Sequence, residues 1–467
     1  MGKRLIGPVD TIWLNMDRAN NLMVIDSLMF LEGPVDWGRL VETARVRMIE
    51  RYPVFMQRPV MSRTHVGPPH WEDYDFDLEQ HLVRARLETG DDADLQRYVS
   101  EHNSQPLDRS RALWEMHLVD GYDGGAVVFC RLHHALADGI ALARVLLSLT
   151  DSSPDGEPLP DPAAEATDSN EPEMGIVEGA LRVLDAAGSA AGALASAGTQ
   201  LLRNAPRLLE PHVVGDAFTQ TERTAAIADK LLLGPRPRLP FSGTPGTTKR
   251  VVWCDPIAFP DVKRVCTATG ATLNDIMIAA VAGALRTYTL EHGGTPEDTA
   301  TMVPVNVRPL DRPLPKQLGN RFALVLLSLP IGSPSPLGRI AEAKHRMDVI
   351  KHSPEVFLTF GLIKAIGRSG PELERFFVDF FAGKAIGVTT NVPGPREPRY
   401  LAGSRITRIL SWPPESGDQT LGVSIFSYAG EVHVGFRADA DNVPDPERLV
   451  EAFEAEVTTL MGFAHAG

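Results

Sequence analysis

The residues from Ala126 to Leu132 form the feature that most restricts how this chain can fold. Their sequence, Ala-Val-Val-Phe-Cys-Arg-Leu, is apolar except for Arg131. A short run of this kind is typical of a strand that is buried on both faces of a sheet. The run ends directly before two histidines, and Gly139 begins a predicted helix after a short loop. The sequence therefore predicts a covered sheet with polar side chains at the end of one strand, where α/β proteins place reactive groups.

The rest of the N-terminal part alternates predicted strands and helices. Asp36 is expected to cap a helix that ends at Pro53. Beyond this helix and the buried strand, apolar patterns predict strands over residues 22–31 and 114–120, and helices over residues 91–102 and 139–149. This alternation favours an α/β fold.

The C-terminal part repeats the mixed pattern. Thr272 is expected to cap a long apolar helix, with Asp275 at the third helical position as a capping-box variant. Asp445 and Pro446 are expected to begin a final helix. Strands are predicted over residues 302–307, 322–329, 385–390, 419–427 and 431–436.

The middle of the chain differs in composition from both ends. Residues 152–173 are rich in Pro, Asp, Glu and Ser and cannot bury enough apolar surface to form a core. Residues 175–210 are rich in Ala and Leu and predict one or two helices, either a packed connector between domains or a surface that touches lipid. We therefore expect an N-terminal domain over residues 1–150, a linker with connecting helices over 151–245, and a C-terminal domain over 246–467.

Charge and cysteine content exclude several classes of protein. The 467-residue chain has a formal net charge of −14, with 46 Lys and Arg against 60 Asp and Glu, which argues against a general nucleic-acid binder. Its three cysteines are widely spaced, so they predict neither a disulfide framework nor a zinc site and fit a reducing compartment. The sequence holds no run of 18 apolar residues and no signal-peptide pattern at its start. We therefore expect a cytoplasmic protein.

His133 and His134, with Asp138 four residues after His134, are the candidate reactive groups. A neutral imidazole can accept a proton from a hydroxyl near neutral pH, so general acid/base catalysis is one interpretation. Spacing alone leaves two others open. The histidines could be hydrogen-bonded polar residues without a chemical role. They could also ligate a metal with Asp138, which would require further ligands from the scattered remaining histidines.

The arrangement His133-His134-x-x-x-Asp138-Gly139 after a buried strand resembles the signature of the coenzyme A-dependent acyltransferase superfamily. That superfamily includes chloramphenicol acetyltransferase and nonribosomal condensation domains. Further segments resemble the bacterial wax ester synthase/diacylglycerol acyltransferase family, in the same order along nearly the whole chain. They are residues 106–115, 272–275, 303–308 and 390–395, together with Pro8, Asp10 and Asp17. Two positions depart from that family, which usually has proline at the place of Ala112 and glutamate at the place of Asp17.

The resemblance implies an α/β fold of two chloramphenicol-acetyltransferase-like domains with mixed sheets and an active-site tunnel at their interface. It also implies that His134 is the general base for an alcohol that attacks an acyl thioester directly, in a ternary complex. The sequence has no Gly-x-Ser-x-Gly nucleophile motif, which agrees with transfer without an acyl-enzyme. Asn274, near a helix N-terminus, is the candidate donor to the oxyanion, or else a residue that only satisfies the start of its helix.

The other residues of the motif are expected to support His134. His133 is expected to support the loop rather than to transfer a proton. Asp138 invites a catalytic-triad interpretation, but the resemblance favours a structural ion pair with an arginine such as Arg58 or Arg308. Gly139 is expected to leave room for close approach of backbone or substrate.

Three residues outside the motif are assigned to the substrate-binding region, namely Trp114, Asp17 and Asp275. Trp114 is expected to be an aromatic residue of the core or of the tunnel wall. Asp275 is expected chiefly to cap or charge its helix.

These expectations lead to an acyltransferase that uses acyl-coenzyme A as a substrate and needs neither a cofactor nor a metal. Diacylglycerol, giving triacylglycerol, is the first choice of acceptor, and a long-chain alcohol, giving a wax ester, is the second. Such substrates are consistent with peripheral association with a membrane or lipid-droplet surface. Three alternatives remain, which are a condensation-type enzyme using a carrier-protein thioester, a non-catalytic lipid-binding relative, and a metal-dependent hydrolase.

Overall fold

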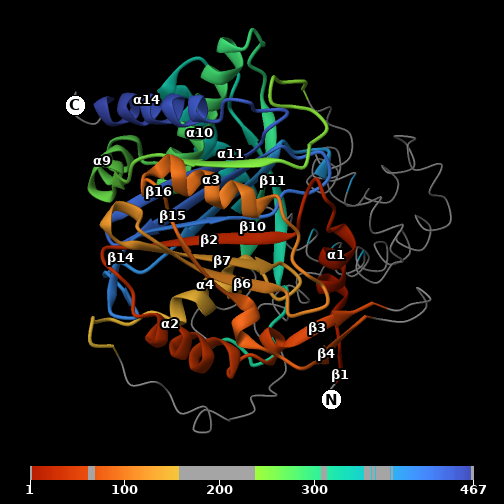
Figure 1. Ribbon diagram of the computed structural model, residues 1–467. Helices are drawn as coiled ribbons and strands as arrows, with labels where there is room; N and C mark the ends of the chain where they lie inside the picture. Colours follow the sequence, from red (N-terminus) through yellow and green to blue (C-terminus); the bar gives the residue numbers. More distant parts are fainter. Residues whose placement is uncertain are drawn as a thin grey trace, which may run out of the picture.

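The computed structural model describes residues 3–61, 69–156, 237–306, 313–351 and 382–463, together with Thr359, Ile363, Ile366 and Asp379. Within these ranges two large mixed sheets form the centre of the molecule (Figure 1). The six-stranded sheet has the order β13 (Tyr400–Leu401), β14 (Ser404–Trp412), β2 (Val24–Leu31), β7 (Ala126–His133), β6 (Trp114–Asp120) and β5 (Leu82–Arg86). The seven-stranded sheet has the order β11 (Phe322–Leu329), β10 (Thr299–Asn306), β12 (Gly387–Pro393), β15 (Leu421–Tyr428), β16 (Glu431–Asp439) and β8 (Lys249–Trp253), and β9 (Ile257–Ala258) also pairs with β16.

A small sheet and the helices surround these two sheets. The small sheet has the order β1 (Lys3–Leu5), β4 (His70–Asp73) and β3 (Gln57–Val60). The described α-helices are α1 (Pro8–Met16), α2 (Trp37–Ala44), α3 (Asp92–Asn103), α4 (Gly139–Ser148), α9 (Phe259–Thr269), α10 (Leu273–Glu291), α11 (Pro336–Lys351) and α14 (Glu447–Phe463). Short π- or 3₁₀-helical turns cover Arg45–Ile49, Pro53–Met56, Leu78–His81 and Tyr122–Gly124.

Strand β7 is buried on both faces, as its apolar sequence predicts, and all of its residues are buried. On one face, Val128 and Cys130 belong to the same core cluster as helix α4. On the other face, Val127 and Phe129 belong to a cluster with residues of α3, β8 and β14. Because both faces are covered, the end of β7 places its histidines inside the molecule and not at its surface.

The two sheets do not follow the order of the chain. Strand β14, from the C-terminal part, pairs antiparallel with β2, so that Ile409 lies opposite Met29 and Trp412 opposite Asp26. In Figure 1 the blue strand β14 accordingly lies beside the red strand β2. The expected region 246–467 therefore contributes two strands to a sheet that is otherwise built from N-terminal residues. The division into three parts by chain order stays a prediction, but sheet pairing crosses it.

A buried network of ion pairs also joins the two large sheets. Asp26 on β2 lies 3.2 Å from Arg437 on β16 and 3.5 Å from Arg131 on β7. Arg437 also lies 2.6 Å from Glu415. All four side chains are buried, so each charge depends on its partners to offset the loss of hydration. The network fixes one sheet against the other and therefore the geometry of any site between them.

Most of the predicted elements are confirmed, with ends shifted by a few residues. Asp36 caps α2 by accepting from the Arg39 N–H, and the Thr272–Asp275 capping box begins α10. The sequence interpretation predicted no strand over the β14 region. The predicted helices over residues 175–210 and most of the predicted linker lie outside the described residues.

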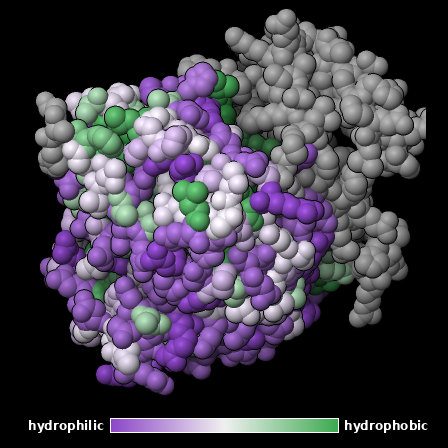
Figure 2. Space-filling model, turned by 90° about the horizontal axis from the view of Figure 1, so that it is seen from above, coloured by the Kyte–Doolittle hydropathy of each residue, from purple (hydrophilic) through white to green (hydrophobic). Residues whose placement is uncertain are grey.

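The described surface is mostly polar on the face seen in Figure 2, where apolar side chains occur in small, separate groups. No single helix in the described ranges is long and apolar enough to cross a membrane. Helices α9 and α10 reach that length and composition only together, across a bend of 96°.

Candidate active site

His134 lies at the start of the loop between β7 and α4, in the interior of the molecule. Its backbone N–H donates to the Met23 carbonyl at 2.8 Å, which ties the loop to the segment before β2. Its side chain is packed between aromatic rings. The Trp13 ring on α1 stacks on the imidazole with centroids 3.9 Å apart, and the Phe322 ring on β11 lies 5.6 Å away. Residues from both halves of the chain therefore meet at this imidazole.

Burial decides the charge of His134. It lowers the pKa of the imidazole to about 4, while the nearby Asp138 carboxylate and the Asn320 side chain act less strongly in the opposite direction. Removing a cationic ring from water is unfavourable, so the neutral form predominates near pH 7. A neutral ring can accept a proton, which is what general base catalysis requires.

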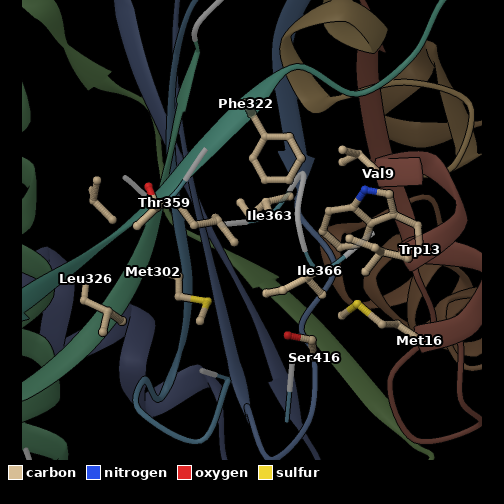
Figure 3. A pocket seen from close by; sticks show the side chains of 13 residues that line it. Val9, Trp13, Met16, Met302, Phe322, Leu326, Thr359, Ile363, Ile366 and Ser416 are labelled. Carbon is tan, nitrogen blue, oxygen red and sulfur yellow. The ribbon is translucent and has the colours of Figure 1, made fainter. Parts of the chain in front are cut away.

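An apolar cavity lies beside these rings, at the junction of the two halves of the chain (Figure 3). It leaves about 100 Å³ that the centre of a water-sized sphere can reach, and its lining is almost wholly apolar. Its walls are Val9, Ile12, Trp13 and Met16 from α1, Met302 from β10, Phe322, Leu324, Val325 and Leu326 from β11, and Thr359, Ile363, Ile366 and Ser416. His134 is not itself a wall residue, but both aromatic rings that contact it are. The cavity can therefore hold an aliphatic chain close to the histidine.

The His133 side chain forms a hydrogen bond inside the loop that follows β7. Its Nδ1 accepts the Ala135 N–H at 3.0 Å, so this nitrogen carries no proton and the proton lies on Nε2. Nε2 lies 3.5 Å from the Asp17 carboxylate. Asp17 also accepts the Met23 N–H at 2.9 Å and pairs with Arg109 at 3.1 Å. Burial acts to raise the pKa of Asp17, but these contacts outweigh it and lower the pKa to about 2. The structure thus places the largely covered Asp17 carboxylate beside His133, and its role in substrate binding stays a prediction.

Asp138 binds backbone groups. One carboxylate oxygen caps α4 by accepting the Ala141 N–H at 2.9 Å, and the other accepts the Arg321 N–H at 3.0 Å. The suggested partner Arg58 is wrong, because Arg58 forms an ion pair with Glu72. The other suggested partner, Arg308, lies outside the described residues.

Gly139 begins α4, as predicted, but no backbone atom crowds it. A Cβ built there would have only a methyl group of Ile25 as a close neighbour, at an ordinary distance of 3.9 Å. The expectation that backbone approaches closely at this position is therefore wrong. The expectation that a substrate uses the space stays a prediction.

Asn320 and Asp10 connect the loop that bears His134 to both halves of the chain. The Asn320 side chain donates to the His134 carbonyl at 2.7 Å and to Asp10 at 2.8 Å, and its backbone N–H also donates to Asp10 at 2.8 Å. Burial raises the pKa of Asp10 to about 6, although these hydrogen bonds act to lower it. Asp10 belongs to α1, whose other face lines the cavity.

Asn274 and Asp275 lie in the first turn of α10. Asp275 and Thr272 form the predicted capping box, with Asp275 accepting the Thr272 N–H at 2.8 Å. The amide oxygen of Asn274 accepts from Asn391 on β12 at 2.9 Å. Among the described residues no hydrogen bond or ring contact joins Asn274 or Asp275 to His134. The structure therefore gives Asp275 a capping role and leaves the role of Asn274 as a proposal.

Trp114 packs in the core of the N-terminal half. Its indole N–H donates to the Phe55 carbonyl at 2.8 Å, and its ring stacks on His81 with centroids 4.7 Å apart. It is not a wall residue of the apolar cavity. Of its two expected roles, core or tunnel wall, the structure supports the core.

The sequence interpretation missed Trp13, Phe322 and Asn320 as neighbours of His134. A signal for α1 was present, because Val9, Ile12, Trp13 and Met16 follow helical spacing and so share one face. Nothing in a single sequence could indicate that this face meets His134. Among the described residues, no group of three or more His, Cys, Asp or Glu side chains is arranged to hold a metal ion.

The family of the chain follows from comparison with known proteins. The model of the wax ester synthase/diacylglycerol acyltransferase catalytic domain matches residues 6–277, and the model of the C-terminal domain of the same family matches residues 318–461. A probable diacylglycerol O-acyltransferase of Mycobacterium tuberculosis strain H37Rv is 26% identical over 96% of this chain and 93% of its own length. A putative diacylglycerol O-acyltransferase of the same strain is 30% identical over 99% of this chain and 98% of its own length.

Solved structures agree with this assignment at the level of the fold. A wax ester synthase/diacylglycerol acyltransferase from Marinobacter aquaeolei VT8 matches with a TM-score of 0.68 and 21% identity, over 99% of this chain and 100% of that one. The first condensation domain of a calcium-dependent antibiotic synthetase matches with a TM-score of 0.58 and 18% identity, over 99% and 96%. The expected chloramphenicol-acetyltransferase-like fold class is confirmed. The chain therefore belongs to the wax ester synthase/diacylglycerol acyltransferase family and is an acyltransferase.

Proposed function

We propose that this protein transfers an acyl group from acyl-coenzyme A to the hydroxyl of diacylglycerol, giving triacylglycerol, with His134 as the general base. A long-chain alcohol is the second candidate acceptor. One observation carries the proposal, which is a buried and neutral imidazole whose two aromatic neighbours, Trp13 and Phe322, line an apolar cavity. Aliphatic substrates gain free energy by entering such a cavity, because their apolar surface leaves water.

The proposed reaction is a direct transfer. Nδ1 of His134 is fully buried, which leaves Nε2 as the nitrogen that a substrate can reach. Nε2 accepts the proton of the acceptor hydroxyl while the hydroxyl oxygen bonds to the thioester carbonyl carbon. The tetrahedral intermediate then collapses, the carbon–sulfur bond breaks, and the coenzyme A thiolate takes the proton back from the imidazolium. The products are an ester and free coenzyme A, and the enzyme needs neither a cofactor nor a metal for this sequence.

Asn274 remains the proposed donor to the oxyanion. Asn391 donates to the amide oxygen of Asn274, and this bond fixes which way the amide faces. The NH₂ group of Asn274 donates to no other residue in the described ranges, so it is available to a substrate oxygen. Removing one such donor typically lowers kcat by about 100-fold to 1,000-fold. The variant Asn274→Ala should fall in that range if the proposal is right.

The choice of acceptor rests on the names of the relatives and on the cavity. The curated relatives described above are named diacylglycerol O-acyltransferases, and the cavity walls are almost wholly apolar. We also propose that the protein meets its lipid substrates at a membrane or lipid-droplet surface. Sedimentation with phosphatidylcholine vesicles that contain diacylglycerol tests this point, and recovery of all the protein in the supernatant would oppose it.

A screen with purified protein tests the function. Acyl-coenzyme A donors are combined with diacylglycerol, monoacylglycerol or fatty alcohols, and thiol release and product mass are both measured. Triacylglycerol formation is expected to exceed wax ester formation. Turnover with an acyl carrier protein but not with acyl-coenzyme A would favour a condensation-type enzyme. Lipid binding without any transfer would favour a non-catalytic relative, and activity lost to a chelator would favour a metal-dependent hydrolase.

A matched histidine variant controls the screen. His433 on β16 is also buried, and burial lowers its pKa to about 3, so it too is neutral near pH 7. It contributes nothing to the cavity walls. We expect His134→Gln to lower transfer by at least about 100-fold, and folded His433→Gln to keep it. Equal losses in both variants would mean that a buried histidine matters only for folding.

A further inference from the structure

Asn320 is the residue immediately before Arg321 and β11, and its side chain reaches across to the N-terminal half. Both protons of its amide NH₂ are used, one by the His134 carbonyl at 2.7 Å and one by Asp10 at 2.8 Å. The next residue, Arg321, donates its backbone N–H to Asp138 at 3.0 Å. Asn320 and Arg321 thus bind three parts of the N-terminal half, which are helix α1, the loop that bears His134, and the start of α4.

Two glycines, Gly7 and Gly319, leave room for the Asp10 carboxylate beside Asn320. A Cβ at Gly7 would lie 2.8 Å from a carboxylate oxygen of Asp10, and a Cβ at Gly319 would lie 3.3 Å from the same oxygen. Larger residues at either position would therefore push the carboxylate away from Asn320. Asp10 and Asn320 are both buried, so neither could exchange its partner for water without opening the site.

We propose that Asn320 is a positioning residue that acts on the reaction through His134. Its bond to the His134 carbonyl fixes the backbone that carries the imidazole. Its bond to Asp10 fixes α1, which carries Trp13, and its place in the chain fixes Phe322. One amide therefore sets the imidazole and both aromatic rings that contact it. This inference rests on the proposed role of His134 as the general base.

The expected effect is on rate rather than on substrate binding. A displacement of about 1 Å in a catalytic group can lower the rate by about 100-fold, because the reacting atoms lose their alignment. Asn320 is not itself a wall residue of the cavity, so the KM for acyl-coenzyme A should change less than kcat. A residue that only joined the two halves would instead change stability and leave kcat almost unaltered.

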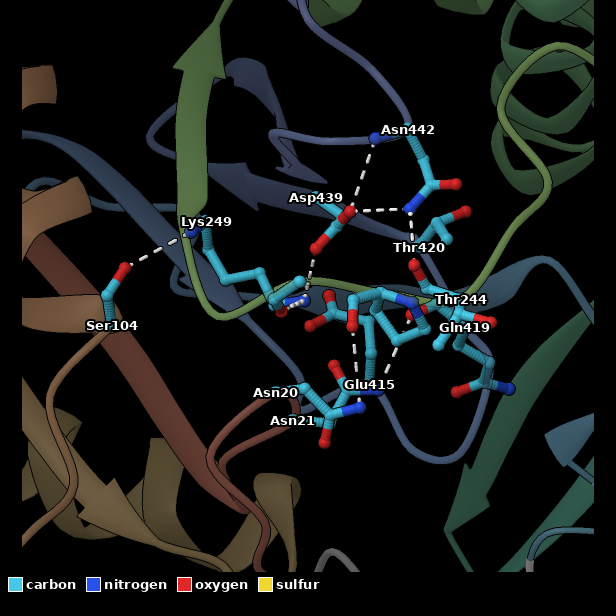
Figure 4. Close-up of polar contacts among 12 residues, drawn as sticks. Asn20, Asn21, Ser104, Thr244, Lys249, Glu415, Gln419, Thr420, Asp439 and Asn442 are labelled. Atoms are coloured by element: carbon cyan, nitrogen blue, oxygen red, sulfur yellow. Dashed lines mark hydrogen bonds and ion pairs between the residues drawn. The ribbon is translucent and has the colours of Figure 1, made fainter.

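The chain offers a matched control in Asn442, which makes the same three kinds of hydrogen bond (Figure 4). Its backbone N–H and its side-chain NH₂ donate to Asp439 at 3.2 and 2.6 Å, and the NH₂ also donates to the Thr244 carbonyl at 3.1 Å. It binds a carboxylate and a carbonyl as Asn320 does, but neither belongs to the loop of His134. Replacing it removes the same bonds without moving the imidazole.

The first experiment compares Asn320→Ala with Asn442→Ala in the full-length protein. We expect Asn320→Ala to lower kcat by about 10-fold to 100-fold, with the KM for acyl-coenzyme A within about 3-fold of wild type. Asn442→Ala should lower the melting temperature but keep kcat within about 2-fold. A folded Asn320→Ala variant with kcat within about 3-fold of wild type would overturn the proposal.

A double variant, in which Asp10 and Asn320 exchange places, separates the two bonds of Asn320. It keeps the test valid if Asn320→Ala fails to fold. In the exchange Asp10→Asn with Asn320→Asp, an amide again faces a carboxylate, so α1 stays tied to the segment before β11. The carboxylate at position 320 cannot donate to the His134 carbonyl. We expect this protein to regain stability but to keep a low kcat, whereas recovery of wild-type kcat would contradict a role through His134.

A double variant distinguishes failure of this inference from failure of the proposed function. If Asn320 acts through His134, then Asn320→Ala should add no further loss to His134→Ala. A loss that multiplies the two single effects would reject the positioning role and leave His134 as the base. Full activity in His134→Ala would instead reject the proposed function itself.

Discussion

The indole of Trp13 lies flat on the imidazole of His134, with ring centroids 3.9 Å apart and the ring planes inclined by 27°. The same indole forms part of the cavity wall. Trp13 therefore separates the proposed base from water on one side and contacts the space for the acyl chain on the other. The stack explains how a histidine can stay neutral while lying close to a substrate cavity.

Replacing Trp13 should separate packing from chemistry. Trp13→Phe keeps an aromatic ring on His134, and we expect kcat to stay within about 10-fold of wild type. Trp13→Ala leaves a void beside the imidazole and should lower the free energy of unfolding by about 3–5 kcal/mol, as measured by urea denaturation. An alanine variant as stable as wild type would show that the stack contributes little.

The pH dependence of kcat/KM should report the low pKa of His134. The neutral ring is the active form, so protonation of His134 should lower the rate only near its pKa of about 4. Asp10, with a pKa of about 6, should add a smaller inflection near that pH. That inflection should vanish in Asp10→Asn.

A loss of activity with an apparent pKa near 6.5 would contradict this prediction if the loss persists in Asp10→Asn. It would mean that the imidazole of the working enzyme is hydrated. The pH dependence of kcat/KM tests His134 better than the pH dependence of stability, because His134 and Asp10 change stability in opposite directions. His134 has a lowered pKa, so its contribution to stability is present above about pH 6.5 and is lost as pH falls toward 4. Asp10 has a raised pKa and changes stability in the opposite direction between about pH 6 and 4.

Asp138 should affect folding more than chemistry. Its carboxylate accepts the Ala141 and Arg321 N–H groups, and Asp138→Ala removes both bonds. Loss of the helix cap alone typically costs about 0.5–2 kcal/mol. We expect the melting temperature to fall, with kcat per folded molecule within about 10-fold of wild type. Unchanged stability combined with lost turnover would instead support a catalytic triad.

Asp17 offers a test of structural against substrate-binding roles. Its folded pKa of about 2 lies below the ordinary value of 3.8, so its ionised form stabilises the protein by about 2 kcal/mol above pH 4, and this contribution is lost as pH falls toward 2. Asp17→Asn should therefore destabilise the protein at pH 7 but not at pH 2. A normal melting temperature with a raised KM for acyl-coenzyme A would return Asp17 to the substrate site.

The sequence predicts the local features of the site well. The apolar run before His133 indicates a doubly covered strand, and Thr272 followed by Asp275 indicates the start of α10, because both signals lie within a few neighbouring residues. Gly139 likewise begins its helix where expected. These features depend on short-range sterics and hydrogen bonding, which a single sequence records directly.

The remainder depends on contacts between distant parts of the chain. Pairing of β14 with β2 and the bond from Asn320 to the His134 carbonyl join residues from opposite halves. These contacts depend on how whole sheets pack against each other, and no local sequence pattern indicates them. For Trp114 the sequence left the core and the tunnel wall open, and its contacts with Phe55 and His81 support the core.

The most direct test of this account is the turnover of folded His134→Ala with acyl-coenzyme A and diacylglycerol. We predict a fall in kcat of at least about 100-fold, the usual scale for loss of a general base. The KM for acyl-coenzyme A should change little, and circular dichroism should match wild type. A folded variant that keeps kcat within a few-fold of wild type would contradict the central claim that this imidazole takes the hydroxyl proton.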